Sequence, residues 1–185
     1  MRKFLVGGGL VGVLLVGLWA ASAAAPANFA GTWALDKTKS KDLPPQMANI
    51  DSLTLTVTQD AQQLTVDTKV VRKETTDAQG GGPGSGRGRG MGMGMSGPQS
   101  YKLDGSETSI DTGGRGTATA KAEWQNDGKT LKLTTKRSFN FQGNDVTLTT
   151  TETWTLSGDG KTLTIERTSE SPRGTQTSTL VFNKQ

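Results

Sequence analysis

The sequence predicts an all-β fold: an antiparallel up-and-down meander barrel of about eight to ten strands, preceded by an N-terminal signal peptide. Threonine alternates with leucine, valine and isoleucine through much of the chain, as in residues 53–58 and 163–165. Asp-Gly and Gly-Asn pairs separate such segments, and no segment repeats apolar residues at helical spacing. Alternating β-branched residues suit half-buried strands, and these pairs suit tight turns. Many strands of even length joined by short turns favour a barrel, with an open sheet or a sandwich as the alternative.

The first twenty-five residues have the layout of a secretory signal peptide. Arg2 and Lys3 give a positive start, residues 4–19 are apolar, and residues 20–25 are small. This order is typical of a cleaved signal, and an uncleaved membrane anchor is the alternative. We expect an exported protein, periplasmic or extracellular, that has no membrane attachment after cleavage. Loss of Arg2 and Lys3 lowers the net charge from +4 to +2, so no nucleic-acid partner is expected.

The mature chain, residues 26–185, is long enough for one domain. The only helical candidate is the segment 37–51, which Pro44-Pro45 interrupts. A glycine-rich stretch at 78–98 is expected to be a disordered loop, since it has too little apolar surface to offset the entropy of ordering. Strands are expected at 31–36, 52–59, 62–72, 98–103, 106–112, 116–125, 129–141, 145–156, 161–171 and 175–184.

Composition excludes several kinds of active site. The 185 residues include no cysteine and no histidine. Disulfides, thiolate nucleophiles, cysteine-based zinc sites and Ser-His-Asp triads are therefore excluded. No pair of carboxylates is placed for acid–base work, so we expect no catalytic residues, no cofactor and no enzymatic activity.

Turns predict the strand registers, and the registers predict which side chains face inward. We place turns at Asp127-Gly128, Gly143-Asn144, Asp159-Gly160 and Arg173-Gly174. All four hairpins then place their apolar residues on one face. The predicted cross-strand pairs are Trp124 with Leu131, Ala122 with Leu133, Ala120 with Thr135, Ala118 with Arg137, Phe139 with Leu148, Arg137 with Thr150, Thr135 with Glu152, Glu152 with Arg167, Trp154 with Ile165, Phe182 with Ile165, and Leu180 with Arg167.

This inward face contains a polar band between two apolar ends. Glu152 is predicted to lie across from Arg167 and diagonal to Arg137, and a buried charge needs a partner. Two arginines and one carboxylate leave one positive charge, which an anionic ligand would balance. The inward alanines 118, 120 and 122 leave room for a ligand, unless neighbouring side chains fill it and the ion pairs are structural. The predicted ligand-binding residues are Arg137, Glu152, Arg167, Thr135, Thr150, Trp154 and Phe139.

The run Phe29 to Asp36, with Gly31 and Trp33 on the first strand, resembles the calycin superfamily of lipocalins and fatty-acid-binding proteins. It also looks like a group of secreted bacterial lipocalin-like proteins of uncharacterised function. The resemblance implies a lipocalin-like barrel with a fatty-acid-binding-protein-like layout, small apolar ligands, and interior arginines that hold a ligand carboxylate. It also implies that Trp33 closes one barrel end under a basic side chain, either Lys184 or Arg167. The lipocalin disulfides are absent, and the helical lid of fatty-acid-binding proteins is missing or reduced to residues 37–51.

We therefore expect an exported, monomeric binding protein for a small hydrophobic or amphipathic ligand, with an anionic ligand as one option. One alternative is a non-catalytic interaction module with a filled core. Another is a Cu(I)-binding accessory protein, because Met91, Met93 and Met95 alternate with glycine and thioether ligands favour Cu(I).

Overall fold

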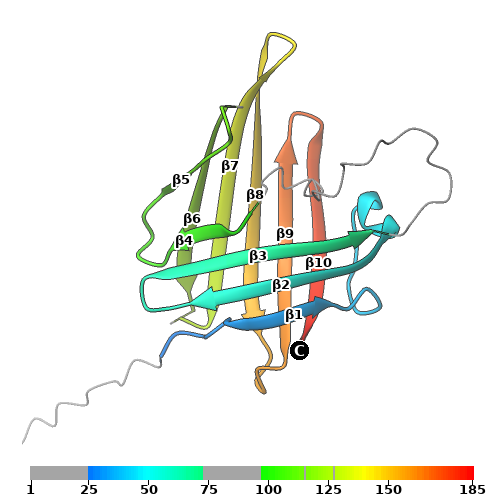
Figure 1. Cartoon of the computed structure of the whole chain (residues 1–185), viewed down its shortest axis with the longest axis vertical. Coiled ribbons are helices and arrows are strands. Elements are labelled where there is room, and N and C mark those ends of the chain that lie inside the picture. Colours follow the sequence, from blue (N-terminus) through cyan, green and yellow to red (C-terminus); the bar gives the residue numbers. More distant parts are fainter. Residues whose placement is uncertain (1–24, 73–96, 115, 127) are drawn as a thin grey trace, which may run out of the picture.

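The computed structural model describes residues 25–72, 97–114, 116–126 and 128–185, and its strands form one antiparallel sheet. The strands are β1 (Gly31–Leu35), β2 (Ile50–Gln59), β3 (Gln63–Arg72), β4 (Gln99–Lys102), β5 (Thr108–Ile110), β6 (Thr117–Gln125), β7 (Thr130–Phe141), β8 (Asn144–Leu156), β9 (Thr162–Ser171) and β10 (Gly174–Lys184). Their order is β4-β3-β2-β1-β10-β9-β8-β7-β6-β5, so β1 joins the N-terminal strands to the C-terminal strand. The sheet curls into a nearly closed barrel (Figure 1).

This architecture confirms the predicted all-β antiparallel meander barrel. Each of the ten predicted strands overlaps one observed strand. The segment 37–51 contains one short 3-10 helix, η1 (Pro45–Asn49), which starts directly after Pro44 and is far smaller than a helical lid. The signal peptide predicted at 1–25 and the loop predicted at 78–98 lie almost entirely outside the described residues. Within the described ranges, no helix is long and apolar enough to cross a membrane.

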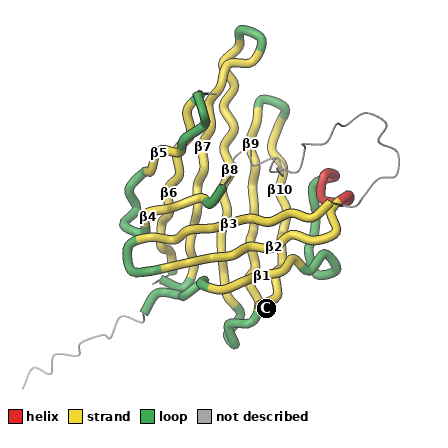
Figure 2. Tube along the Cα trace, in the orientation of Figure 1, coloured by secondary structure: helices red, strands yellow, loops and turns green. Residues whose placement is uncertain are grey.

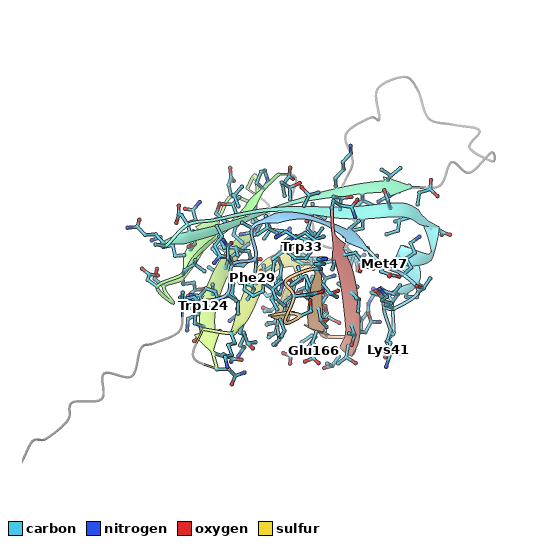
Figure 3. The ribbon with its side chains drawn as sticks, turned by 90° about the horizontal axis from the view of Figure 1, so that it is seen from below. Phe29, Trp33, Lys41, Met47, Trp124 and Glu166 are labelled. Atoms are coloured by element: carbon cyan, nitrogen blue, oxygen red, sulfur yellow. The ribbon has the colours of Figure 1, made fainter. Side chains whose placement is uncertain are left out.

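The barrel has two layers that differ in extent. Strands β1 to β3 cross one half of β6 to β10, while the β7–β8 hairpin projects beyond them (Figures 1 and 2). Figure 3 shows the two layers edge-on, with Phe29 and Trp33 between them. We call the covered part the Trp33 half, and the part that contains residues 135–150 of the β7–β8 hairpin the hairpin half.

The Trp33 half has a filled core. Phe29 lies 5.7 Å from Trp154 in an edge-on contact and 6.1 Å from Trp124 in a stacked contact, both between ring centroids. The large side chains of this half come from both layers, and almost none of their surface is accessible to solvent. The interior of this half is therefore packed like an ordinary protein core. The largest of them are Trp33, Trp154, Phe29, Phe182, Ile50, Leu64, Leu131, Leu133, Leu163, Ile165 and Leu180.

Trp33 closes this end of the barrel, as the resemblance implies. Its indole N–H donates a hydrogen bond to the carbonyl oxygen of Phe29 at 2.9 Å. The ammonium of Lys184, not Arg167, lies over the ring at 5.2 Å from its centroid, within the range of a cation–π contact. Gly31 has a φ of +141°, and a Cβ atom there would lie 2.9 Å from Cε of Lys184. Glycine at this position therefore lets the lysine reach the tryptophan.

Two of the four predicted registers are confirmed. Strands β6 and β7 pair with Ala118 opposite Arg137 and with Trp124 opposite Leu131. Strands β8 and β9 pair with Glu152 opposite Arg167.

The registers predicted for β7–β8 and β9–β10 are wrong by two residues. The β7–β8 turn is Gln142-Gly143, with φ values of +53° and +82°; both are positive, as in the type I′ turns that suit hairpins. The β9–β10 turn is Pro172-Arg173. A shift of two residues keeps every side chain on its predicted face and changes only its partner. The observed pairs are Phe141 with Asn144, Phe139 with Val146, Arg137 with Leu148, Thr135 with Thr150, Leu133 with Glu152, Phe182 with Leu163, Leu180 with Ile165, and Ser178 with Arg167.

Candidate functional site

Inward side chains of β6 to β10 lie in rows, because residues opposite each other in an antiparallel pair point to the same face. Two adjacent rows are polar, and we name them the ion-pair row and the hydroxyl row. The hydroxyl row lies one step nearer the hairpin tip. The ion-pair row is Ala122, Leu133, Glu152, Arg167 and Ser178; the hydroxyl row is Ala120, Thr135, Thr150, Ser169 and Gln176.

A buried ion pair is the centre of the first of these rows. Arg167 donates from Nε to Oε1 of Glu152 at 2.8 Å, and its Nη2 lies 2.6 Å from the same oxygen. The indole N–H of Trp154 donates to the other oxygen, Oε2, at 2.8 Å. The two charged side chains are 13 % and 12 % exposed. Each carboxylate oxygen therefore has a strong partner, and Arg167 is balanced by the protein itself.

Tyr101 connects β4 to this polar region. Its hydroxyl lies 3.3 Å from Oγ1 of Thr135. Burial and the nearby charge of Glu152 raise the pKa of the Tyr101 phenol above its usual range. Tyr101 is therefore a neutral hydrogen-bonding group at any physiological pH.

Arg137 lies apart from the ion pair, contrary to the predicted diagonal contact with Glu152. In the observed register Glu152 is opposite Leu133, and Arg137 is opposite Leu148. Leu133 and Arg137 are four residues apart on one strand, which corresponds to about 14 Å. The expected cluster of two arginines around one carboxylate is therefore wrong, because the β7–β8 turn begins one residue earlier than predicted.

Arg137 instead borders a hollow in the hairpin half. The hollow has a volume of about 550 Å³ and is lined by Gly114, Gly116, Arg137, Phe139, Asn140 and Leu148. Its size falls within the usual range for small-molecule sites, of roughly 300–1,000 Å³. The lining combines the guanidinium of Arg137 with the apolar side chains of Phe139 and Leu148, so it suits a ligand that has both a polar and an apolar part.

A glycine-rich turn forms one wall of this hollow. Gly116 has a φ of +93°, and a Cβ atom there would lie 2.0 Å from the carbonyl oxygen of Ser138 on β7. Only glycine allows the chain to approach β7 this closely. Gly114 and Gly116 were not predicted as site residues, although the closely spaced glycines at 113, 114 and 116 indicate an unusual turn at this place.

The inward alanines of β6 do not border open space. Ala118, Ala120 and Ala122 are buried, and the last two belong to the same apolar cluster as Tyr101 and Leu103. The sequence left open whether these alanines leave room for a ligand or whether neighbouring side chains fill that room. The structure shows that neighbouring side chains fill it.

The predicted ligand-binding residues therefore fall into two groups. Glu152, Arg167 and Trp154 form the buried network, with Thr135 and Thr150 in the adjacent row, whereas Arg137 and Phe139 line the hollow. Ser169, Gln176 and Leu148 were not predicted as site residues. The correctly predicted β8–β9 register already places Ser169 opposite Thr150, so that residue could have been found, whereas Gln176 lies opposite Ser169 and Leu148 opposite Arg137 only in the observed registers. The predicted copper ligands Met91, Met93 and Met95 lie outside the described residues. Within the described part of the chain, no three carboxylates cluster as a metal site would need.

No protein-family model matches the sequence. No curated protein is significantly similar to it. Among solved structures, the chain is similar to zebrafish ileal bile acid-binding protein complexed with cholic acid. The identity is 14 %, the match covers 85 % of this chain and 98 % of that chain, and the TM-score is 0.47. The strand order and the antiparallel registers establish the meander barrel by themselves.

Proposed function

We propose that this protein is a non-catalytic, exported binding protein for a small amphipathic ligand, which it holds in the hollow of its hairpin half. The hollow itself carries the proposal, since it combines a guanidinium with apolar walls. Arginine is suited to two-point contact with a carboxylate or another planar anion. The ligand's anionic group then lies at Arg137, and its apolar part lies against Phe139 and Leu148.

The filled core supports this location. Side chains occupy the Trp33 half, and Glu152 already balances Arg167. An anion that bound at Arg167 would have to displace a carboxylate held by three short contacts. Arg137 lies two rows away from that pair and borders open volume, so a ligand can reach it without displacing the Glu152 carboxylate. Export enters the proposal because residues 1–25 have the layout of a signal peptide.

Decanoate is a suitable first probe, with binding measured by isothermal titration calorimetry below its micelle concentration. We expect Arg137→Gln to weaken decanoate binding by about tenfold or more, because a hydrogen bond to a charged group contributes about 1.5–3 kcal/mol. Arg173→Gln is the matched control, since it removes the same charge from the exposed β9–β10 turn. Equal losses in the two variants, or no binding by the wild type, would refute the proposal.

A non-catalytic interaction module is the second candidate, and the filled Trp33 half favours it. The same titration separates the two functions. A folded protein that binds neither decanoate nor other amphiphiles would favour the interaction module.

A further inference from the structure

The tip of the β7–β8 hairpin has one apolar face and one polar face. Phe139, Phe141 and Val146 occupy the last two rows of the inward face before the turn. The outward side chains are polar and hydrogen-bond to each other across the two strands: Ser138 with Thr147 at 3.0 Å, and Asn140 with Asp145 at 3.1 Å. The hairpin tip is therefore amphipathic.

Phe141 is exposed at a position that the proposed ligand does not explain. It is 55 % exposed and lies beside the turn of a hairpin that projects beyond the neighbouring strands (Figure 1). A single exposed apolar residue is ordinary on a soluble protein, but a phenylalanine at the end of a projecting amphipathic hairpin is not. The lining of the hollow includes Phe139 but neither Phe141 nor Val146.

The apolar surface at the tip is too small for a stable contact with a second copy of the chain. A phenylalanine side chain has roughly 200 Å² of surface, so Phe141 exposes about 110 Å². Half-buried Phe139 and Val146 raise the apolar surface to no more than about 250 Å², whereas a stable interface buries about 800 Å² on each partner. A lipid surface needs no such area, because one side chain leaves water by insertion.

Distances along β7 also suit a lipid surface. Interfacial side chains reach about 5–10 Å into the boundary between head groups and acyl chains. Arg137 lies four residues before Phe141 on the same face, which corresponds to about 14 Å. In an upright hairpin with Phe141 inserted, Arg137 and the hollow therefore lie at the level of the head groups, where an amphiphile in a bilayer has its polar group.

From this arrangement we infer that the hairpin tip inserts reversibly into the surface of a lipid bilayer, with Phe141 as the inserted side chain. This partner goes beyond the proposed function, and the observations on Phe141 do not depend on a bound ligand. Asp145 is the only charged residue in the segment 139–148, and it lies on the polar face with Asn140. Insertion therefore depends on apolar surface and not on the charge of the lipid.

Partition of the protein onto phosphatidylcholine vesicles tests the inference, measured by sedimentation of the vesicles over a range of lipid concentrations. We expect Phe141→Ser to weaken partition by about tenfold, because the exposed ring no longer leaves water. Val71→Ser is the matched control, since it removes the other large apolar side chain that is exposed in the described ranges, at 43 %, and should change partition by less than twofold. Circular dichroism and thermal unfolding confirm that each variant is folded.

The absence of cysteine from the sequence allows a single introduced cysteine to carry an environment-sensitive fluorophore. At Asn144→Cys, opposite Phe141, we expect vesicles to shift the emission to the blue and spin-labelled lipids to quench it. At Lys161→Cys, exposed beyond the other end of β8, we expect neither change. This comparison also holds in a chain that retains residues 1–25, because insertion of that apolar segment would not bring a label at position 144 into lipid.

Three results would overturn the inference: no partition of the wild type, equal losses in Phe141→Ser and Val71→Ser, or equal signals from the two labels. Dimers in the absence of lipid that Phe141→Ser abolishes, detected by sedimentation velocity, would also overturn it and would assign the tip to a second copy of the chain. The decanoate titration keeps the proposed function separate. Phe141→Ser should still bind decanoate, and Arg137→Gln should still bind vesicles.

Discussion

The buried pair of Glu152 and Arg167 is the feature on which single-residue changes should have the largest effect. Both partners are almost fully covered, and Trp154 holds the second carboxylate oxygen. Arg137 is too far away to repel Arg167 across this row. Neutralising either partner therefore leaves one uncompensated charge in a region of low dielectric constant, with no relief elsewhere.

We expect Glu152→Gln to lower the free energy of unfolding by about 3–5 kcal/mol, since it leaves the Arg167 guanidinium without its counter-ion. Urea unfolding followed by tryptophan fluorescence measures the change. The control is Glu166→Gln, because Glu166 is exposed on the outer face next to Arg167 (Figure 3). A change within about 0.5 kcal/mol is expected there. Equal effects at both positions would show that the pair does not contribute as its geometry indicates.

At the level of elements, the β7–β8 hairpin determines the geometry of the candidate site. Its turn sets which residues of β8 lie opposite Arg137 and Phe139, and it therefore builds one wall of the hollow. The turn itself contains a local conflict: Gln142 has a φ of +53°, in the left-handed region that most side chains avoid. Asparagine occupies this region more readily than glutamine, and Asn-Gly is the preferred pair for such turns.

We expect Gln142→Asn to stabilise the protein by about 0.5–1 kcal/mol, which corresponds to a rise in melting temperature of roughly 1–4 °C for a chain of this size. Differential scanning calorimetry measures it. Gln176→Asn is the comparison, since Gln176 is exposed on β10 and asparagine has no turn advantage in a strand. An unchanged or lower melting temperature in Gln142→Asn would contradict the turn geometry.

The whole molecule combines a packed half with an open half. Strand β1 pairs with β2 on one side and β10 on the other, so residues from both ends of the chain meet over Trp33. Past this layer, the β7–β8 hairpin has no covering strand in the described structure (Figure 1). Such a division lets the core supply stability while the site remains accessible.

We expect amide hydrogen exchange to follow that division. Amides of β7 and β8 in the Trp33 half, near Leu131 and Trp154, should exchange most slowly, because large buried side chains surround them. Amides near the turn at 142–143 should exchange much faster, through local opening. Mass spectrometry on peptides from each half measures the rates. Uniform protection along β7 and β8 would mean that the hairpin half is as tightly packed as the core.

The alternation in the sequence predicted every strand that the structure describes. It also predicted the face on which their side chains lie, because all four hairpins place their apolar residues on the inward face. Side-chain direction has a period of two, so one apolar pattern fixes the face regardless of the exact pairing. The same period explains why the registers of β7–β8 and β9–β10 were predicted wrongly, because a shift of two residues keeps the same side chains on the inward face. Two registers that differ by two residues can be told apart only by the position of the turn. The alternative turn positions differ little in free energy, so the sequence did not distinguish them.

The sequence by itself therefore determined the fold class, the inward set of residues and the pairing of Glu152 with Arg167. Only the tertiary structure decided that Arg137 lies two rows from that pair, that the alanines of β6 are covered, and that the Trp33 half is filled. The position of Arg137 depends on the β7–β8 turn. The other two depend on contacts between residues far apart in the chain: on β4 packed against β6, and on the layer of β1 to β3 placed over one half of the sheet. The hollow is lined by Gly114, Gly116 and residues of β7 and β8, and no periodicity within a single strand records which distant residues lie beside it.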